Sequence, residues 1–159
     1  MKFLVWYFAY GSNMDSKRLE ARIGRSSMQW AVGMIRGYEL VFNKVANDES
    51  GYANIRPSER GIVYGVLYLL SKQELRKLNR YEGVPEHYKC VRLQVETEHD
   101  VIKAMSYIAA DSKVKEGLRP RCDYLECLIK GAKEHNLPQD YIRQLSEIEC
   151  LKGDTPGAG

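Results

Sequence analysis

Hydrophobic residues occur along this chain in short continuous runs separated by polar turns, a pattern typical of a strand-rich domain. The first run, residues 3–10, is short and rich in aromatic residues, so it predicts a buried strand. The strongest run, residues 61–70, predicts a second. Further strands are expected over residues 28–34, 38–45, 52–56, 87–96 and 101–109, with a break near Gly37 and an end at Pro57.

Helices are marked by their capping residues. Asp15 or Ser16 begins a helix that Gly24 ends. Ser71 begins another, and Glu74 three residues later completes a capping box. The expected helices therefore cover residues 16–23, 72–81, 121–136 and 140–148.

The order of these elements indicates the fold class. Strands dominate the first two thirds of the chain, and helices are inserted among them or follow them, without regular strand–helix alternation. We therefore expect an α+β fold in which a curled or barrel-like mixed sheet has helices packed outside it. A length of 159 residues is enough for one hydrophobic core. Residues 1–150 are expected to form a single domain and residues 151–159 a disordered tail.

Charge and hydropathy exclude two classes of partner. The net charge is +3, and basic residues alternate with acidic ones rather than gathering in an Arg-rich run. This argues against a nucleic-acid partner. The N-terminal apolar run ends at Tyr10, too short to span a membrane, and it lacks the features of a signal peptide. A cytoplasmic protein that binds neither nucleic acid nor membrane is expected.

The cysteines and histidines indicate no metal. Cys90, Cys122, Cys127 and Cys150 include no C-x-x-C pair. On one expected helix, Cys122 and Cys127 differ in direction by about 140°, which suits neither a metal nor a disulfide between them. All four are interpreted as reduced cytosolic thiols. The three histidines are scattered, so no metal site and no cofactor are expected.

The most informative segment is Tyr10-Gly11-Ser12-Asn13-Met14, where the first strand gives way to a helix. A strand that breaks at Gly and continues as a helix forms a nest of backbone N–H groups that binds a carboxylate or an oxyanion. A simpler interpretation is that Gly11 permits the bend and Asn13 caps the helix, which explains Tyr10 and Ser12 less well. The motifs G-x-x-x-x-G-K-[ST], G-x-G-x-x-G and G-x-S-x-G are absent, so a small carboxylate is the expected ligand.

Glu82 is a lone acidic residue just past the second helix. Such a residue is usually a solvated surface charge. Here Gly83 and Pro85 turn the chain sharply and direct the carboxylate back toward the sheet. Partial burial would raise its pKa and suit it to acid/base catalysis near neutral pH. An anion nest with a separate carboxylate indicates an enzyme acting on a zwitterionic, amino-acid-like substrate.

Four segments, in this order, resemble the γ-glutamylcyclotransferase family. The resemblance covers roughly residues 3–149. Its segments are Tyr7–Met14, Gly51–Ile55 with Pro57, Val63–Tyr68 with Leu78–Val84, and Lys130–Glu134 with Leu137, Pro138 and Tyr141.

The resemblance implies a small mixed β-barrel with flanking helices and a small-molecule γ-glutamyl substrate. It places Glu82 on the catalytic acid/base and Tyr124 on a substrate-contacting tyrosine. The implied reaction is attack of the substrate's α-amine on its own γ-carbonyl, giving 5-oxoproline and an amino acid or amine, as in glutathione metabolism. The implied substrate loop, which holds the γ-glutamyl group through backbone N–H groups, comprises Tyr7, Phe8, Ala9, Tyr10, Gly11, Ser12 and Asn13.

Several alternatives stay open. On the same fold the substrate could be a γ-glutamyl-amine, or a biosynthetic intermediate carrying a γ-glutamyl protecting group. The chain could also be a non-catalytic binding domain, or a serine hydrolase that uses Ser12, although no histidine is placed to activate that residue. Exposed helix faces would allow a homodimer.

Overall fold

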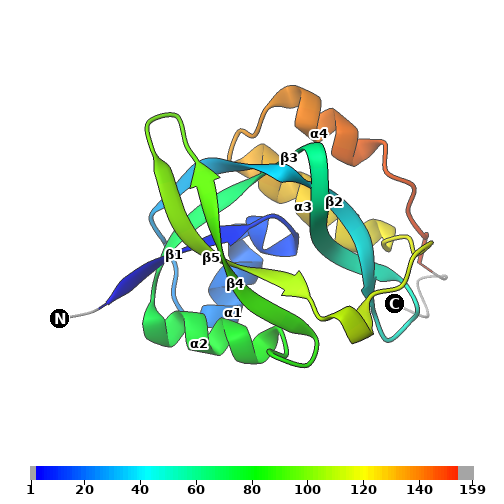
Figure 1. The fold of residues 1–159 in the computed structure, drawn as a ribbon, viewed down its shortest axis with the longest axis horizontal. Coiled ribbons are helices and arrows are strands. Elements are labelled where there is room, and N and C mark those ends of the chain that lie inside the picture. The colour runs from blue at the N-terminus through cyan, green and yellow to red at the C-terminus, as the bar shows by residue number, and fades with distance from the viewer. Residues whose placement is uncertain (1–2, 154–159) are drawn as a thin grey trace.

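The computed structural model describes residues 3–153, which fold into a closed β-barrel with helices packed outside it (Figure 1). The strands are β1 (Leu4–Ala9), β2 (Trp30–Val45), β3 (Gly51–Ser71), β4 (Tyr88–Glu96) and β5 (Val101–Ala109). The helices are α1 (Ser16–Ile23), α2 (Lys72–Tyr81), α3 (Cys122–Glu134) and α4 (Gln139–Ser146), with short 3-10 helices η1 (Ser12–Met14) and η2 (Asp111–Lys113). The α+β barrel expected from the sequence is confirmed.

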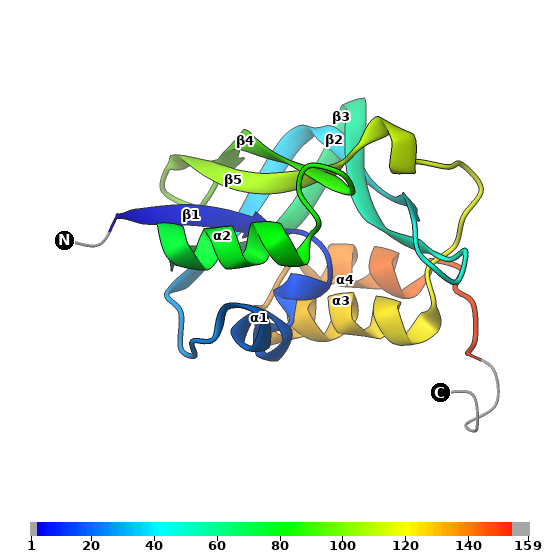
Figure 2. The same cartoon turned by 90° about the horizontal axis from the view of Figure 1, so that it is seen from below.

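Two hairpins and the first strand make the barrel. The strands follow the order β1-β3-β2-β4-β5, and the neighbouring strands pair antiparallel except β1 and β5, which pair in parallel and close the barrel. Figure 2 shows α1, α3 and α4 on one side of the barrel, with α2 alongside β1. The chain leaves the end of β1 on the side of the barrel that faces this helical layer.

Two expectations about strand ends were wrong. The break near Gly37 is a bulge inside one long β2, because the register shifts between Arg36 and Tyr38 and Gly37 takes a φ of 86°. Pro57 lies within β3, opposite Tyr38 and beside this shift. The inter-strand hydrogen bonds are already interrupted at this bulge, so Pro57, which has no N–H to donate, does not end the strand.

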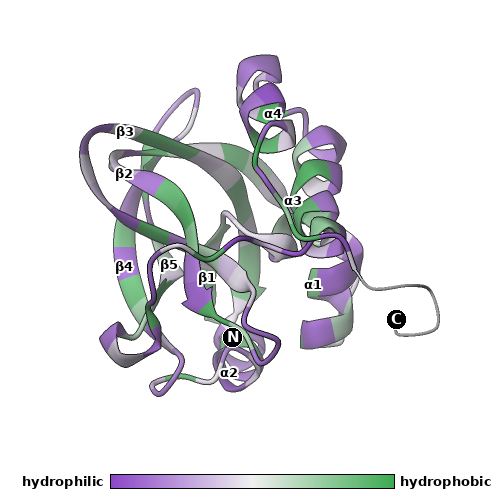
Figure 3. Cartoon of the chain, turned by 90° about the vertical axis from the view of Figure 1, so that its right-hand side faces the viewer, coloured by the Kyte–Doolittle hydropathy of each residue, from purple (hydrophilic) through white to green (hydrophobic). Residues whose placement is uncertain are grey.

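The core joins the barrel to the helices. Phe8, Leu67 and Leu78 are fully buried, and Figure 3 shows hydrophobic residues along the strands and on α3. A side chain at Gly131 of α3 would meet the backbone of Met14 at 2.3 Å, so α3 packs directly against η1. This contact fixes the strand-to-helix turn against the helix that carries Tyr124.

The expected helix caps are confirmed. The Asp15 side chain accepts a hydrogen bond from the backbone N–H of Lys17, and Gly24 ends α1 in the left-handed conformation. Ser71 and Glu74 form the capping box of α2, which ends at Tyr81 as expected. Among residues 3–153, no helix is both long and apolar enough to span a bilayer.

The expectation that all four cysteines are reduced was wrong for two of them. Cys122, at the start of α3, forms a disulfide with Cys150, while Cys90 and Cys127 are free. The bond joins residues 28 apart in the chain, a spacing that carries no signal by itself. It ties the N-terminal end of α3 to the segment after α4. Of the expected tail, residues 154–159 lie outside the described part of the chain.

Reduction of this disulfide should destabilise the protein by about 3–4 kcal/mol, because opening a 28-residue loop returns entropy to the unfolded chain. Urea unfolding with and without a phosphine reductant measures the difference. The Cys122→Ser/Cys150→Ser double variant should match the reduced wild type and gain nothing from oxidation. Equal stability of the oxidised and reduced wild type would contradict this prediction.

Candidate functional site

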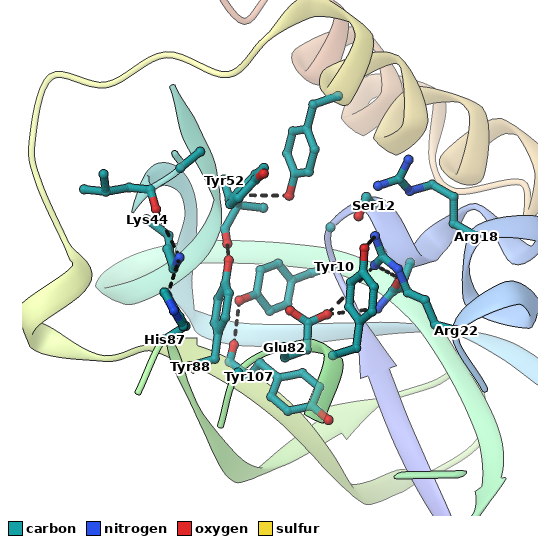
Figure 4. A pocket seen from close by; sticks show the side chains of 18 of the residues that line it. Tyr10, Ser12, Arg18, Arg22, Lys44, Tyr52, Glu82, His87, Tyr88 and Tyr107 are labelled. Carbon is teal, nitrogen blue, oxygen red and sulfur yellow. Dashed lines mark hydrogen bonds and ion pairs between the residues drawn. The ribbon is translucent and has the colours of Figure 1, made fainter. Parts of the chain in front are cut away.

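A cavity of about 360 Å³ opens where the barrel meets the helical layer (Figure 4). Seven of the chain's 11 tyrosines line it. Residues 3–153 contain no cluster of three or more His, Cys, Asp or Glu side chains arranged for a metal. The lining residues used below are Tyr7, Tyr10, Gly11, Ser12, Asn13, Arg18, Arg22, Lys44, Tyr52, Ala53, Glu82, Gly83, His87, Tyr88 and Tyr124.

The end of β1 contributes two tyrosines to the cavity. Tyr7 and Tyr10 line it, whereas Phe8 and Ala9 are buried in the barrel beside Gly65 and do not. The Tyr10 hydroxyl donates to the carbonyl of Tyr107 at 2.5 Å, so it is engaged in holding β1 against β5. The side chains of Phe8 and Ala9 therefore belong to the barrel core and not to the cavity wall.

The nest expected after β1 has the required free donors. Within residues 3–153, the backbone N–H groups of Gly11, Ser12 and Asn13 take part in no hydrogen bond, although all three residues line the cavity. Gly11 has a φ of −112° and a ψ of −141°, so it does not lie in the left-handed region. The need for glycine is steric, because a Cβ would lie 3.2 Å from the Cβ of Ala53 and 3.6 Å from the Tyr124 hydroxyl.

Asn13 connects this turn to Glu82. Its side-chain amide donates to the Tyr7 hydroxyl at 3.0 Å and to Oε1 of Glu82 at 3.4 Å. Its carbonyl oxygen accepts from the guanidinium of Arg22. The same guanidinium lies 3.9 Å from Oε1 of Glu82 and stacks on the Tyr81 ring, 4.0 Å from the ring centroid. Asn13 is therefore held from three sides and orients the carboxylate.

The carboxylate of Glu82 is largely withdrawn from solvent, with 17% of its side chain exposed. Burial raises its pKa above the ordinary value of 4.5, against the opposing effects of Arg22, the Asn13 hydrogen bond and Lys44. The expectation of a partly buried carboxylate turned toward the sheet is thus met in the geometry. A group of this kind can exchange protons with a ligand near neutral pH.

A tight turn holds Glu82 in place. Gly83 follows it with a φ of 70°, and a Cβ there would lie 2.7 Å from the ring of His87. The backbone N–H of His87 donates to the Gly83 carbonyl at 2.8 Å. Glu82 and His87 are therefore fixed relative to one another by a single glycine-dependent turn.

Tyr124 is the predicted residue that comes from farthest along the sequence. Its hydroxyl accepts the backbone N–H of Ala53 at 3.0 Å, and burial raises its pKa. Tyr7, whose hydroxyl accepts from Asn13, has a pKa raised by burial in the same way. Both hydroxyls stay protonated at physiological pH and keep their own O–H to donate to a ligand.

The basic side chains of the cavity were missed by sequence reasoning. Arg18 and Arg22 are four residues apart on α1, a spacing that places both on the helix face next to the nest and could have revealed them. The Nε atom of Arg18 is buried and has no hydrogen-bond partner among residues 3–153. Lys44 and His87 lie on the other side of Glu82 (Figure 4). They are 43 residues apart in the chain, and no local sequence pattern predicts that they meet.

Comparison with known proteins identifies relatives over most of the chain. Residues 62–145 match the AIG2-like family. The γ-glutamylcyclotransferases of Mus musculus and Homo sapiens are each 31% identical to this chain over 150 residues, covering 90% of it and 78% of each relative. A solved γ-glutamyl cyclotransferase structure superimposes with a TM-score of 0.85 at 28% identity, covering 94% of this chain and 90% of that one.

The raised pKa of Glu82 gives the protein a pH-dependent cost of folding. The stabilising contribution of the protonated carboxyl is fully present below the unfolded pKa and is lost as pH rises through the higher folded pKa. Glu82→Gln does not titrate, so its unfolding free energy relative to wild type should increase between pH 4 and pH 8. Urea unfolding across this range measures it, with exposed Glu59→Gln as the matched control. A pH-independent difference would contradict the prediction.

Proposed function

This chain belongs to the AIG2-like, γ-glutamylcyclotransferase family, and on that basis we propose that it converts γ-glutamyl amides into 5-oxoproline and a free amino acid or amine. The observation that carries the proposal is a buried carboxylate, Glu82, in one cavity with the backbone N–H groups of residues 11–13, which have no hydrogen-bond partner in the described part of the chain. This arrangement suits a substrate that presents both an ammonium group and carboxylate oxygens.

In the proposed reaction Glu82 acts first as a base. Its carboxylate takes a proton from the substrate's α-ammonium, and the neutral amine attacks the γ-carbonyl carbon to close a five-membered ring. The tetrahedral intermediate collapses as the C–N bond to the leaving group breaks, and Glu82 returns its proton to the leaving nitrogen. The ring nitrogen, positively charged after the attack, releases its extra proton, which the free amine takes up. Such acid/base catalysis contributes about 10²–10⁴-fold. The raised pKa of Glu82 supports both transfers.

The remaining groups of the cavity would bind and fold the substrate. The N–H groups of residues 11–13 offer donors to the glutamyl carboxylate or to the developing oxyanion, as does Nε of Arg18, which no described residue engages. The hydroxyls of Tyr7 and Tyr124 can donate to further oxygens. Holding amine and carbonyl together lowers the barrier by reducing the entropy that ring closure must lose. No nucleotide, metal or covalent enzyme intermediate takes part.

Two rival functions make different predictions. A serine hydrolase would need a histidine bonded to Ser12, and the hydrogen bonds of residues 3–153 include no such pair. It would also be labelled at Ser12 by a fluorophosphonate. A non-catalytic binding domain has no need to bury a carboxylate at the expense of its stability. A cytoplasmic location and the absence of nucleic-acid and membrane partners stay predictions.

Glu82→Gln should lower kcat for 5-oxoproline formation by two or more orders of magnitude, because it keeps the shape of the side chain and removes the base. Mass spectrometry of 5-oxoproline after incubation with a panel of γ-glutamyl amino acids and γ-glutamyl-amines measures it. The panel also separates the alternative substrates, which share the ring closure and differ in the leaving group.

The matched control for that substitution is Glu59→Gln, an exposed carboxylate outside the cavity that should turn over as wild type does. Normal turnover by a folded Glu82→Gln protein would show that the mechanism is wrong. A wild type that forms no 5-oxoproline from any member of the panel would overturn the proposed activity.

Gly11→Val should impair substrate binding, raising KM by about tenfold or more. Its branched side chain would collide with Ala53 and displace the Tyr124 hydroxyl from the cavity wall. Steady-state kinetics on the best substrate of the panel gives KM, and thermal unfolding shows whether the variant is folded. As a control, Gly117→Val makes the same change at an exposed glycine outside the cavity, whose φ of 84° strains any side chain, so it should lose stability and keep the wild-type KM. An unchanged KM in folded Gly11→Val would count against a binding role for the turn.

A further inference from the structure

Resting on the proposed ring closure, we propose that Lys44, held by His87, is a specificity-determining residue that binds a carboxylate on the leaving group. The favoured substrates would then be γ-glutamyl amino acids rather than γ-glutamyl amides of simple amines. The argument starts from the placement of Lys44 in the cavity.

Lys44 is a buried lysine that has no acidic partner in the described part of the chain. Only 5% of the residue is exposed, and within residues 3–153 no carboxylate lies within ion-pair distance of its Nζ atom. Lysine is almost never buried this far without a counter-ion. The Tyr52 and Tyr88 rings, at 5.7 and 5.6 Å from Nζ, stabilise the cation only in part. A ligand that enters the cavity can supply the missing negative charge.

The fold directs Lys44 into this position. The register between β2 and β3 shifts between Val41 and Lys44, and such a bulge turns the following side chain away from the regular alternation. Burial and neighbouring Lys113 lower the pKa of Lys44, while Glu82 across the cavity raises it. A bound carboxylate would offset the cost of burial and favour the charged form.

The hydrogen bonds around Nζ leave one N–H donor of Lys44 free for a carboxylate. Nζ donates to the Val45 carbonyl at 3.0 Å and lies 3.1 Å from Nδ1 of His87. An ammonium has three N–H donors and no acceptor, so Nδ1 must accept and the Nε2 atom of His87 must carry the ring hydrogen. The third N–H of Lys44 has no partner among residues 3–153. It can donate to one oxygen of a carboxylate bound in the cavity, while His87 holds the ammonium in place.

The distribution of charge in the cavity supports the assignment. Arg18 and Arg22 lie on one side of Glu82, and Lys44 with His87 lies on the other (Figure 4). A γ-glutamyl amino acid carries one carboxylate on its glutamyl part and one on its leaving group, with the reacting ammonium between them. The proposed base therefore faces the ammonium, and each carboxylate meets basic residues. A γ-glutamyl-amine would leave Lys44 without a counter-ion.

A matched pair of substrates tests this inference. γ-Glutamyl-alanine and γ-glutamyl-alaninamide have nearly the same shape and differ in the leaving-group charge. Wild type should prefer the acid in kcat/KM by about tenfold to a hundredfold, the usual effect of a charge-assisted hydrogen bond. Lys44→Met should bring the ratio of the two values near one. Both substrates use the same Glu82, so any change that the loss of Lys44 causes in Glu82 affects both kcat/KM values and cancels in their ratio.

Controls separate the possible failures. Lys103→Met removes an exposed strand lysine outside the cavity and should keep the wild-type ratio. If Lys44→Met does not fold, Lys44→Gln replaces it. A folded variant that keeps the wild-type preference for the acid, or a wild type that shows none, would overturn the role of Lys44 while leaving ring closure intact.

Failure of the proposed activity gives a different result. If wild type turns over neither substrate, calorimetric titration of the same two compounds still decides the inference. Tighter binding of the acid than of the amide, lost in Lys44→Met, would support the subsite without the reaction. Equal binding of both compounds, or binding of neither, would overturn it.

Discussion

The site depends on the closure of the barrel by β1. This strand pairs with β3 on one side and with β5 on the other, and its last residues are buried. Side-chain bonds add to the pairing, because Ser106 donates to the Phe8 carbonyl at 2.8 Å and Tyr10 to the Tyr107 carbonyl at 2.5 Å. The chain therefore leaves the barrel at a defined point, and α3 packs against the turn that follows through Gly131. Free backbone donors at such a turn are positioned by the whole fold rather than by a flexible loop.

The second constraint is electrostatic. One carboxylate, Glu82, lies in a cavity whose other charged groups are basic, and its pKa reflects a balance between burial and those neighbours. Burial raises this pKa, and the guanidinium of Arg22, 3.9 Å from Oε1, lowers it. That balance is what a group needs in order to accept a proton and later return it.

Local signals in the sequence predicted the helix caps and the turns that position the site. The caps at Asp15 and Ser71, the turn at Gly11 and the sharp bend after Glu82 are all encoded within a few residues, and each is found at its expected place. Contacts between residues far apart in the chain were not predicted by such local signals. The continuity of β3 through Pro57 depends on a bulge in β2, and the Cys122–Cys150 bond depends on how α4 returns to α3. Lys44 was overlooked because its burial results from strands and turns that meet only in the folded chain.

The central claim is that the substrate's own amine, and not water or an enzyme nucleophile, attacks the γ-carbonyl. The most direct test is turnover of γ-glutamyl-alanine in water enriched in oxygen-18, with mass spectrometry of the glutamyl product. Ring closure predicts 5-oxoproline and free alanine with no heavy oxygen incorporated. Glutamate carrying oxygen-18 as the product would instead show hydrolysis and would contradict the account.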